Sequence, residues 1–307
     1  MKTKRRSPHR KQPKGVVKGT TAQLAILRLL RRYEVLPSTY MVAGYGKPQG
    51  AERLITLLNH NDYIEVVPGS TRHSKVYNRP RVYQLTQKGE QLLGATESWR
   101  ESDHFKHKFL RCVAQFSFDL APKEVPGLRL LTLDDILARP QSPARTRAAR
   151  NPSSFSVAGH EVRPDANLFG FEYRGRYFYL HGFEIDRGTE TRTPGTESGY
   201  RRKNITRMIR AYTAYVAHGQ FRALYGISNV SIAIICTNAS SLRSIVHVLD
   251  RECESTQVKD RFLFTTIPDF SGPDPFLPPS AHLFTRDWER WDGSRFNIQR
   301  FLKGGDS

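Results

Sequence analysis

The chain has 307 residues, with 48 Lys and Arg against 29 Asp and Glu, and its formal net charge at pH 7 is +19. This length allows a sizeable core and predicts two domains. The charge predicts a polyanionic partner, and nucleic acid is favoured over an anionic membrane.

No apolar run reaches the roughly 18 residues that span a bilayer, and the N-terminus lacks a signal peptide's apolar core, so we expect an intracellular, cytoplasmic protein. The three cysteines (Cys112, Cys236 and Cys253) are too far apart for a disulfide framework or a zinc knuckle, and each is expected to be a small buried residue.

The N-terminal segment, residues 1–19, carries many basic groups, no acidic group and few apolar ones. Such a composition cannot offset the entropy lost on ordering, so we expect a disordered arm. The arm either neutralises phosphates or is simply a solvated tail.

Residues 20–97 are predicted to form the first domain. Apolar residues at helical spacing predict one helix that begins near Thr20, a short one within residues 37–46 and a third from residue 48. In the third helix Leu54, Leu57 and Leu58 are expected to face the core. Two strand-like segments, "YIEVV" and "RVYQLT", follow on either side of a basic loop.

This order of three helices, a strand, a basic loop and a strand resembles a winged helix. In that fold the third helix enters the major groove of DNA and the hairpin wing contacts the phosphates. The resemblance implies DNA contacts by two residues of the third helix, Gln49 and Arg53, and by three of the wing, Arg72, His73 and Lys75. Winged helices also serve as protein-interaction modules, so the fold alone does not fix the partner.

The second domain is predicted to span residues 98–307. A helix is expected within residues 101–120, because Phe105, Phe109, Cys112 and Phe116 recur at spacings of three and four. His104 and His107 near its start have a metal-like spacing, yet no further ligand completes a site, so we expect structural or surface roles for them. Residues 138–154 are rich in Pro, Ser, Ala and Arg and predict a flexible basic loop.

Three acidic residues lie in the next two strand-like segments, "HEVRPDANLFGF" and "RYFYLHGFEID", which the glycine-containing "EYRGR" joins as a hairpin. Side chains alternate along a strand, so Glu184 and Asp186 are expected on one face, with Phe183 and Ile185 directed to a core on the other. Strand pairing about the turn brings Asp165 to the face of the two acids. Converging carboxylates repel one another unless a cation lies among them, and an oxygen-only ligand set suits Mg²⁺ or Mn²⁺.

The remaining elements alternate between helix and strand. Residues 200–219 predict a helix with Ile205, Met208, Ile209 and Tyr212 on an apolar face, and Lys203, Arg207 and Arg210 opposite. "VSIAIICT" predicts a buried strand, "SSLRSIVHVLDREC" a helix and "RFLFTTI" a further strand. Near the C-terminus, Trp288 and Trp291 are assigned to a terminal helix that packs on the core.

This order resembles the restriction-endonuclease-like core of the PD-(D/E)xK nuclease superfamily, an α+β or α/β fold with a mixed sheet. Pro164 and Asp165 look like its first signature element. "RPDA", "FEIDRGTE" and a basic helix with two tyrosines are, in addition, similar to the replication-relaxation family of plasmid and mobile-element proteins, in which a winged helix precedes a nuclease-like domain. The similarity extends over about residues 20–270.

The resemblance implies a metal-dependent DNA endonuclease or nickase that acts in replication, relaxation or transfer of an element. Asp165, Glu184 and Asp186 would hold Mg²⁺ or Mn²⁺ at the catalytic centre. The implied substrate is double-stranded or branched DNA, and the implied partners are a second copy of the chain or other replication and transfer proteins. Arg187, Arg202, Arg207 and Arg210 are the expected phosphate contacts near this centre.

One departure bears on catalysis. The usual signature ends in a lysine two residues after the second acid, and Asp186 stands there. Lys203 or Arg187 is then expected to supply the missing positive charge. The alternative is a non-catalytic DNA-binding replication accessory or transcriptional regulator with a degenerate nuclease fold, whose acids pair with arginines. A third option, peripheral membrane binding, requires a basic amphipathic helix with outward apolar groups, and none stands out.

Overall fold

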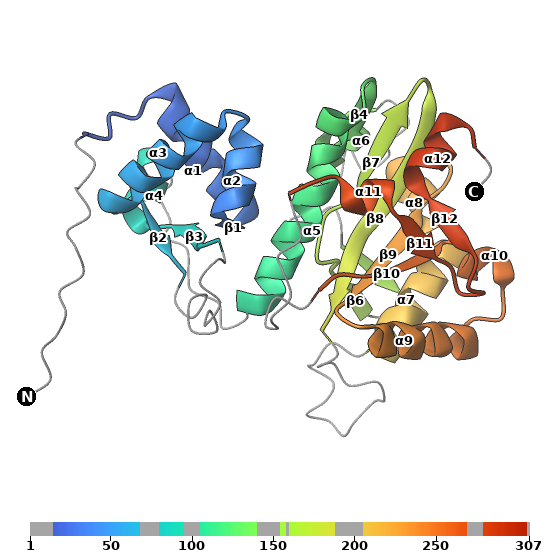
Figure 1. Cartoon of the computed structure of the whole chain (residues 1–307). Helices are drawn as coiled ribbons and strands as arrows, with labels where there is room; N and C mark the ends of the chain where they lie inside the picture. Colours follow the sequence, from blue (N-terminus) through green and yellow to red (C-terminus); the bar gives the residue numbers. More distant parts are fainter. Residues whose placement is uncertain are drawn as a thin grey trace, which may run out of the picture. The chain divides into compact units, whose positions relative to one another are not determined.

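The structure, a computed structural model, describes residues 15–67, 80–94, 105–139, 154–157, 160–187, 205–268 and 279–305. The chain divides into two units, Met1–Cys112 and Val113–Ser307, and the division falls within helix α5 (Phe105–Glu124) (Figure 1). The domain boundary predicted at residues 97 and 98 lies outside the described residues. So do residues 1–14 of the basic arm, the basic loop 140–153, His104, Arg72, His73, Lys75, Arg202 and Lys203.

The N-terminal unit combines helices with a small antiparallel sheet. Its elements are α1 (Thr21–Tyr33), β1 (Val35–Pro37), α2 (Ser38–Tyr45), α3 (Pro48–His60), β2 (Ile64–Val66), β3 (Val82–Leu85) and α4 (Gln87–Leu92). The Thr20 side chain accepts a hydrogen bond from the backbone N–H of Gln23, and the Gln23 side chain accepts one from the backbone N–H of Thr20, which fixes the start of α1. The strands lie in the order β1-β3-β2. The predicted three helices and two strands are present, whereas β1 was not predicted.

The buried face of helix α3 agrees with the prediction at Leu58 but not at Leu54 and Leu57. Ala51, Ile55 and Leu58 are its buried residues, while Leu54 and Leu57 are half-buried at the margin. The buried positions are spaced by four and then three residues, as expected for a single helical stripe. The prediction considered only the leucines and therefore missed Ala51 and Ile55, which lie at the centre of the stripe.

The C-terminal unit is built on a seven-stranded mixed sheet in the order β12-β11-β10-β9-β8-β7-β4. Its strands are β4 (Leu128–Leu131), β7 (Phe169–Tyr173), β8 (Arg176–Asp186), β9 (Ser231–Cys236), β10 (Phe262–Thr266), β11 (Asp287–Glu289) and β12 (Arg295–Asn297). The central β8, β9 and β10 are parallel, and the neighbours on both sides are antiparallel. β5 (Phe155–Val157) and β6 (His160–Val162) form a separate antiparallel pair. The protein is therefore a mixed α and β protein with a mixed sheet.

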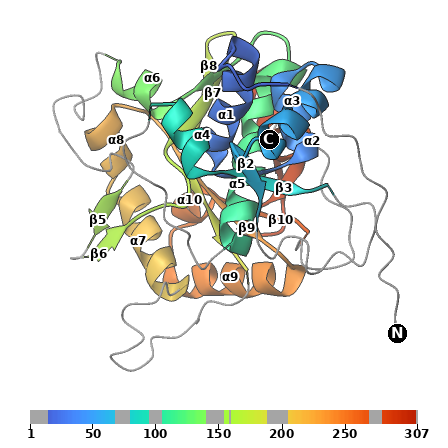
Figure 2. The ribbon, with the colours of Figure 1, turned by 90° about the vertical axis from the view of Figure 1, so that its left-hand side faces the viewer.

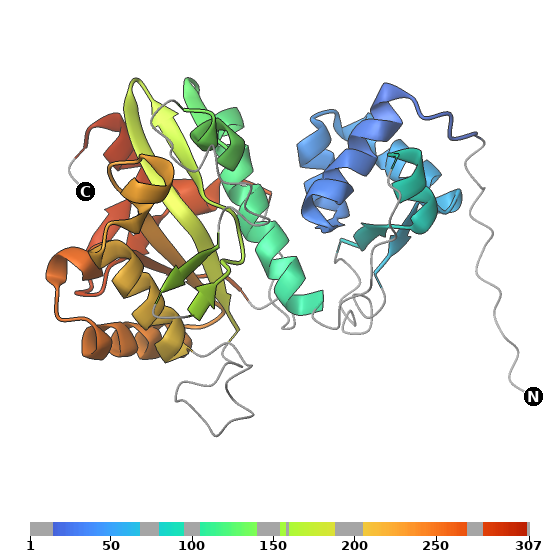
Figure 3. The same ribbon diagram turned by 180° about the vertical axis from the view of Figure 1, so that it is seen from behind.

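Helices cover both faces of this sheet. α5, α11 (His282–Thr285) and α12 (Ile298–Lys303) cover the face seen in Figure 1, and α7 (Ile205–Ala217) and α8 (Gln220–Tyr225) cover the face seen in Figure 3. α9 (Ala239–Glu252) packs with α7 on that second face and lies at the bottom of the sheet in Figures 1 and 2. The short α6 (Leu133–Leu137) follows β4, and α10 (Thr256–Lys259) precedes β10.

The two faces have separate aromatic and aliphatic cores. Phe118 of α5 lies with its ring centroid 5.0 Å from that of Phe169 and 6.1 Å from that of Phe183. On the other face, α7 and α9 pack on β9, and all residues of β9 are buried. Burial on both faces explains why residues 232–236 within "VSIAIICT" are continuously apolar. Apart from the helix predicted around Trp288 and Trp291, the predicted helices and strands of this unit are present, and all three cysteines are buried and free, as predicted.

The C-terminal tryptophans are not on a helix. Trp288 lies in β11 and is fully buried, and Trp291 lies in the turn before β12. Gly293 has a φ of +82°, which a turn tolerates and a helix does not. The prediction that this segment packs on the core is confirmed for Trp288, which is fully buried, and for Trp291, which is partly buried against the core. Its assignment to a helix is wrong, because helix α12 begins only at Ile298.

Candidate functional site: acidic residues at the end of strand β8

The β7–β8 hairpin forms at the predicted turn. Tyr173 pairs with Arg176, and the two intervening residues, Arg174 and Gly175, have φ angles of +50° and +79°. Positive φ at both positions is typical of the two-residue turns whose twist matches that of the strands. The hairpin orders β8, whose carboxyl end carries Glu184 and Asp186.

A β-bulge lies just before these acids. Leu180 pairs with Ser231 and Phe183 with Ala233, so β8 uses one residue more than β9 between the two pairs. An extra residue changes the face to which all later side chains point. His181 and Glu184 therefore both contact α7, although they are three residues apart on one strand. Phe183 points to the opposite face, toward Phe118, as predicted.

Asp165 lies beside β8, held by two hydrogen bonds. Its backbone N–H donates to the carbonyl oxygen of Phe183 at 3.2 Å. The backbone N–H of Ile185 donates to Asp165 Oδ2 at 2.8 Å. Because Ile185 stands between Glu184 and Asp186, the Asp165 carboxylate is brought next to the segment that carries both acids.

Tyr212 of α7 donates a hydrogen bond from its hydroxyl to Glu184 Oε1 at 2.6 Å. Tyr212 is fully buried, and Glu184 is 2% exposed. Burial raises the pKa of Tyr212 well above its ordinary value, and the negative charges of Glu184 and then Asp165 raise it further. The phenol therefore remains a donor, and both carboxylates act electrostatically on this one hydroxyl.

A parallel contact lies one helical turn further along α7. The hydroxyl of Tyr215 lies 2.9 Å from His181 Nδ1, and both residues are fully buried. The ring of Phe155 packs on the same pair, with its centroid 4.3 Å from that of Tyr215. His181 was not predicted to contribute to the site, and Tyr212 was predicted only as a residue of the apolar face of this helix. The sequence feature that could have identified the two tyrosines is their spacing of three residues on the helix, which places both hydroxyls against the same strand.

The predicted basic contacts of this unit have different surroundings. Arg187 follows Asp186 directly and is half-buried, as is Arg207 in α7. Arg210 is exposed, but its Nε lies 2.6 Å from Glu252 Oε2. Glu252 also pairs with Arg251 at 2.7 Å, so Arg210 is engaged in a surface ion-pair cluster as well as facing solvent.

In the N-terminal unit, Gln49 and Arg53 are exposed on α3, as the prediction of DNA contacts requires. Their exposed neighbour Glu52 adds a negative charge to the same helix. His107, described in α5, is half-buried.

The fit of the acidic site to the implied metal depends on how many ligands the site offers. Within the described ranges, no group of three or more His, Cys, Asp and Glu side chains is arranged to hold a metal ion. Mg²⁺ does not need such a group, because it keeps several waters and is usually bound by one or two carboxylates. Asp165 and Glu184, which both act on the Tyr212 hydroxyl, fit that requirement. Asp186 lies two residues beyond Glu184, on the same face of the strand.

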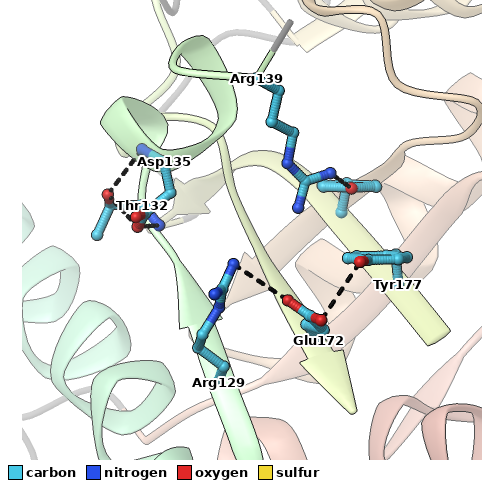
Figure 4. Close-up of polar contacts among 7 residues, drawn as sticks. Arg129, Thr132, Asp135, Arg139, Glu172 and Tyr177 are labelled. Carbon is cyan, nitrogen blue, oxygen red and sulfur yellow. Dashed lines mark hydrogen bonds and ion pairs between the residues drawn. The ribbon is translucent and has the colours of Figure 1, made fainter. Parts of the chain in front are cut away.

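A second polar cluster lies at the opposite end of β8 (Figure 4). Arg129 Nη2 lies 3.1 Å from Glu172 Oε2, and the Tyr177 hydroxyl donates to Glu172 Oε1 at 3.3 Å. Arg139 donates to the Tyr179 hydroxyl, and its guanidinium lies 4.9 Å from the centroid of the Tyr177 ring. These contacts join β4, β7, β8 and the segment after α6. We assign the cluster a structural role, because its charged and polar groups pair with one another across neighbouring strands.

Comparisons with protein-family models, curated proteins and solved structures gave no match for this chain. Among the described residues, no helix combines the length and the apolar character needed to cross a membrane. The case for a function therefore depends on the residues themselves.

Proposed function

We propose that this protein binds DNA and cleaves one or both strands with the help of Mg²⁺ or Mn²⁺ held by Asp165 and Glu184, with Asp186 beside them. The observation that carries the proposal is the approach of Asp165 and Glu184 at the carboxyl end of β8. The backbone contact of Asp165 to Ile185 and the bulge at Gly182 build this arrangement from two separate segments. Glu184 is buried and Asp165 is half-buried, and carboxylates that approach one another are stabilised by a bound cation.

The position of the acids in the sheet supports a ligand site. Asp186 and its pairing partner Cys236 are the last residues of two adjacent parallel strands. Ligands of α/β sheets bind preferentially outside the carboxyl ends of parallel strands. The order α5, three antiparallel strands, α7, β9, α9 and β10 supports a nuclease-like core, in agreement with the resemblance to PD-(D/E)xK nucleases and the replication-relaxation family.

The charge of the chain supports DNA as the substrate. A net charge of +19 favours a polyanion. The first three helices (α1 to α3) and the three antiparallel strands of the N-terminal unit support a winged helix, which would present the exposed Gln49 and Arg53 of α3 to the major groove.

Each part of the acidic site has a role in this proposal. A divalent cation polarises a phosphoryl oxygen and lowers the pKa of a bound water. Asp165 and Glu184 would hold the cation, and Tyr212 would hold Glu184 in place. Nuclease signatures usually take a positive charge from a lysine at this point. Arg187, which is half-buried immediately after Asp186, would provide that charge here, and Lys203 is the other candidate.

One observation favours a second candidate function, a DNA-binding replication accessory or regulator without nuclease activity. Asp186 occupies the place of the signature lysine and adds a negative charge where the transition state needs a positive one. In that case the acids would only shape the fold.

Incubation of supercoiled plasmid with the full chain tests the proposal. Wild type with Mg²⁺ or Mn²⁺ is expected to convert the plasmid to open circles or linear DNA, and EDTA is expected to prevent this. Asp165→Ala/Glu184→Ala should be inactive. Glu172→Gln, which removes an acid on the neighbouring strand β7 outside the site, should cleave as wild type does. Unchanged plasmid with wild type, together with equal DNA binding by all proteins, would favour the non-catalytic candidate.

A further inference from the structure

Tyr212 not only fills the core but also donates a hydrogen bond to Glu184. Its hydroxyl donates to one carboxylate oxygen, Oε1, at 2.6 Å, and neither side chain is accessible to solvent to any appreciable extent. Hydrogen bonds from a neutral donor to a carboxylate are short and strong, and they are stronger still away from water. Glu184 Oε1 is thus engaged by the protein itself.

The ring of Tyr212 is held in place by its surroundings. Its centroid lies 5.4 Å from that of Phe155 and 6.4 Å from that of His181. Met208 and Ile209 of the same helix belong to the buried cluster around it. A donor fixed in this way also fixes the carboxylate that it contacts.

A carboxylate fixed through one oxygen is better suited to some cations than to others. Mg²⁺ requires a small octahedral site and is satisfied by single oxygens from carboxylates, with waters completing the coordination. Ca²⁺ takes six to eight oxygens in a flexible arrangement and often uses both oxygens of one carboxylate. Holding Oε1 on a phenol therefore disfavours binding of a cation by both oxygens of Glu184.

We infer that Tyr212 is a positioning residue that presents Glu184 to a divalent cation through a single oxygen and thereby favours Mg²⁺ and Mn²⁺ over Ca²⁺. This inference rests on the proposed function, because it assumes that the acidic site binds a cation.

Tyr215 provides a matched control. It lies one turn further along α7, is fully buried like Tyr212, and directs its hydroxyl to His181 rather than to Glu184. Tyr215→Phe removes a buried hydroxyl from the same helix without touching the acid.

The test is calorimetric titration of the metal-free full chain with MgCl₂, MnCl₂ and CaCl₂. Tyr212→Phe is expected to lower Mg²⁺ affinity by about 10- to 100-fold, the usual effect of losing a group that orients a metal ligand. The Ca²⁺ affinity of this variant should fall less or rise, so that the ratio of Mg²⁺ affinity to Ca²⁺ affinity becomes smaller than in wild type. Tyr215→Phe should keep the wild-type preference. Thermal unfolding in EDTA establishes that each variant is folded.

Glu184→Asp provides a second test that leaves Tyr212 intact. The shorter side chain keeps the charge but withdraws from the hydroxyl, so the same narrowing of preference is expected. Adding Tyr212→Phe to Glu184→Asp should then change the preference no further, because coupled residues are not additive.

The outcomes separate the two claims. Wild-type protein that binds none of the three cations would overturn both the proposed function and this inference. Wild type that prefers Mg²⁺, with Tyr212→Phe retaining that preference, would overturn the inference alone and leave the proposed function standing.

Discussion

A Cβ atom at Gly182 would lie 2.0 Å from the carbonyl oxygen of Ala166, so the segment that carries Asp165 can approach β8 only because residue 182 is glycine. Gly182 also has a φ of +66°, in the left-handed region. The bulge and the position of Asp165 thus depend on the same residue.

Gly182→Ala is therefore expected to be strongly destabilising. A left-handed backbone at a residue other than glycine costs about 1–3 kcal/mol by itself, and the clash with Ala166 adds to this cost. Urea unfolding measures the loss. Gly175→Ala is the control, because Gly175 has a φ of +79° but no atom within 4 Å of its added Cβ. Equal losses for the two variants would contradict the close approach at Gly182.

Phe118 connects α5 to several parts of the sheet. Its ring packs on Phe169, Phe171, Phe183 and Trp288. Truncation to alanine removes a buried ring and leaves a cavity, and should lower the free energy of unfolding by about 3–5 kcal/mol. Tyr177→Ala, at an exposed position, is expected to cost far less in the same chemical denaturation experiment. A small loss for Phe118→Ala would show that this face of the sheet is not closely packed.

The buried imidazole of His282 is expected to make the protein less stable in acid. Burial lowers its pKa from 6.5 to about 4, and the Arg286 charge adds to the effect, while a hydrogen bond with Ser280 opposes it. The unfolded chain therefore binds a proton that the folded protein rejects. The contribution of neutral His282 to stability is complete above pH 6.5 and is lost as the pH falls toward 4.

Urea unfolding between pH 7 and pH 4 checks this expectation. In His282→Gln the slope of stability against pH should be shallower than in wild type over that window, whereas in His247→Gln, at an exposed position of α9, it should match wild type. The same slope in all three proteins would rule out His282 as the source of the acid sensitivity.

DNA binding is expected to weaken steeply with salt. A protein that contacts six to ten phosphates loses about 10³- to 10⁵-fold in affinity between roughly 50 and 200 mM salt. Arg53→Ala is expected to reduce the slope of log K against log salt by about 1, because it removes one proposed phosphate contact. Arg300→Ala, at an exposed position of α12, is the control. Fluorescence anisotropy with a labelled duplex measures both slopes, and an affinity independent of salt would exclude DNA as the partner.

Strong periodic patterns in the sequence predicted much of this fold. The alternation correctly assigned Phe183 and Glu184 to opposite faces of β8. The apolar face of α7 was correct at each residue named for it. In each of these segments, burial of one face over several residues imposes a regular spacing of apolar residues that the sequence shows.

Other features depend on partners far away in the chain. The bulge before Glu184 exists only in the pairing of β8 with β9, and the alternation within "FYLHGFEID" does not reveal it. Tyr212 is apolar-facing by helical periodicity, yet its hydroxyl meets an acid 28 residues earlier. Short strands such as β1 and β11, three residues each, carry too few residues to show a period.

The strands at the two ends of the seven-stranded sheet are short and charged. β4 spans Leu128–Leu131 and carries the exposed Arg129, and β12 spans Arg295–Asn297 and carries the exposed Arg295. Charged side chains on short outer strands hinder the addition of a strand from another molecule. A chain that accumulates on DNA would experience a high local concentration of its own copies, and these strands would protect it from aggregating there.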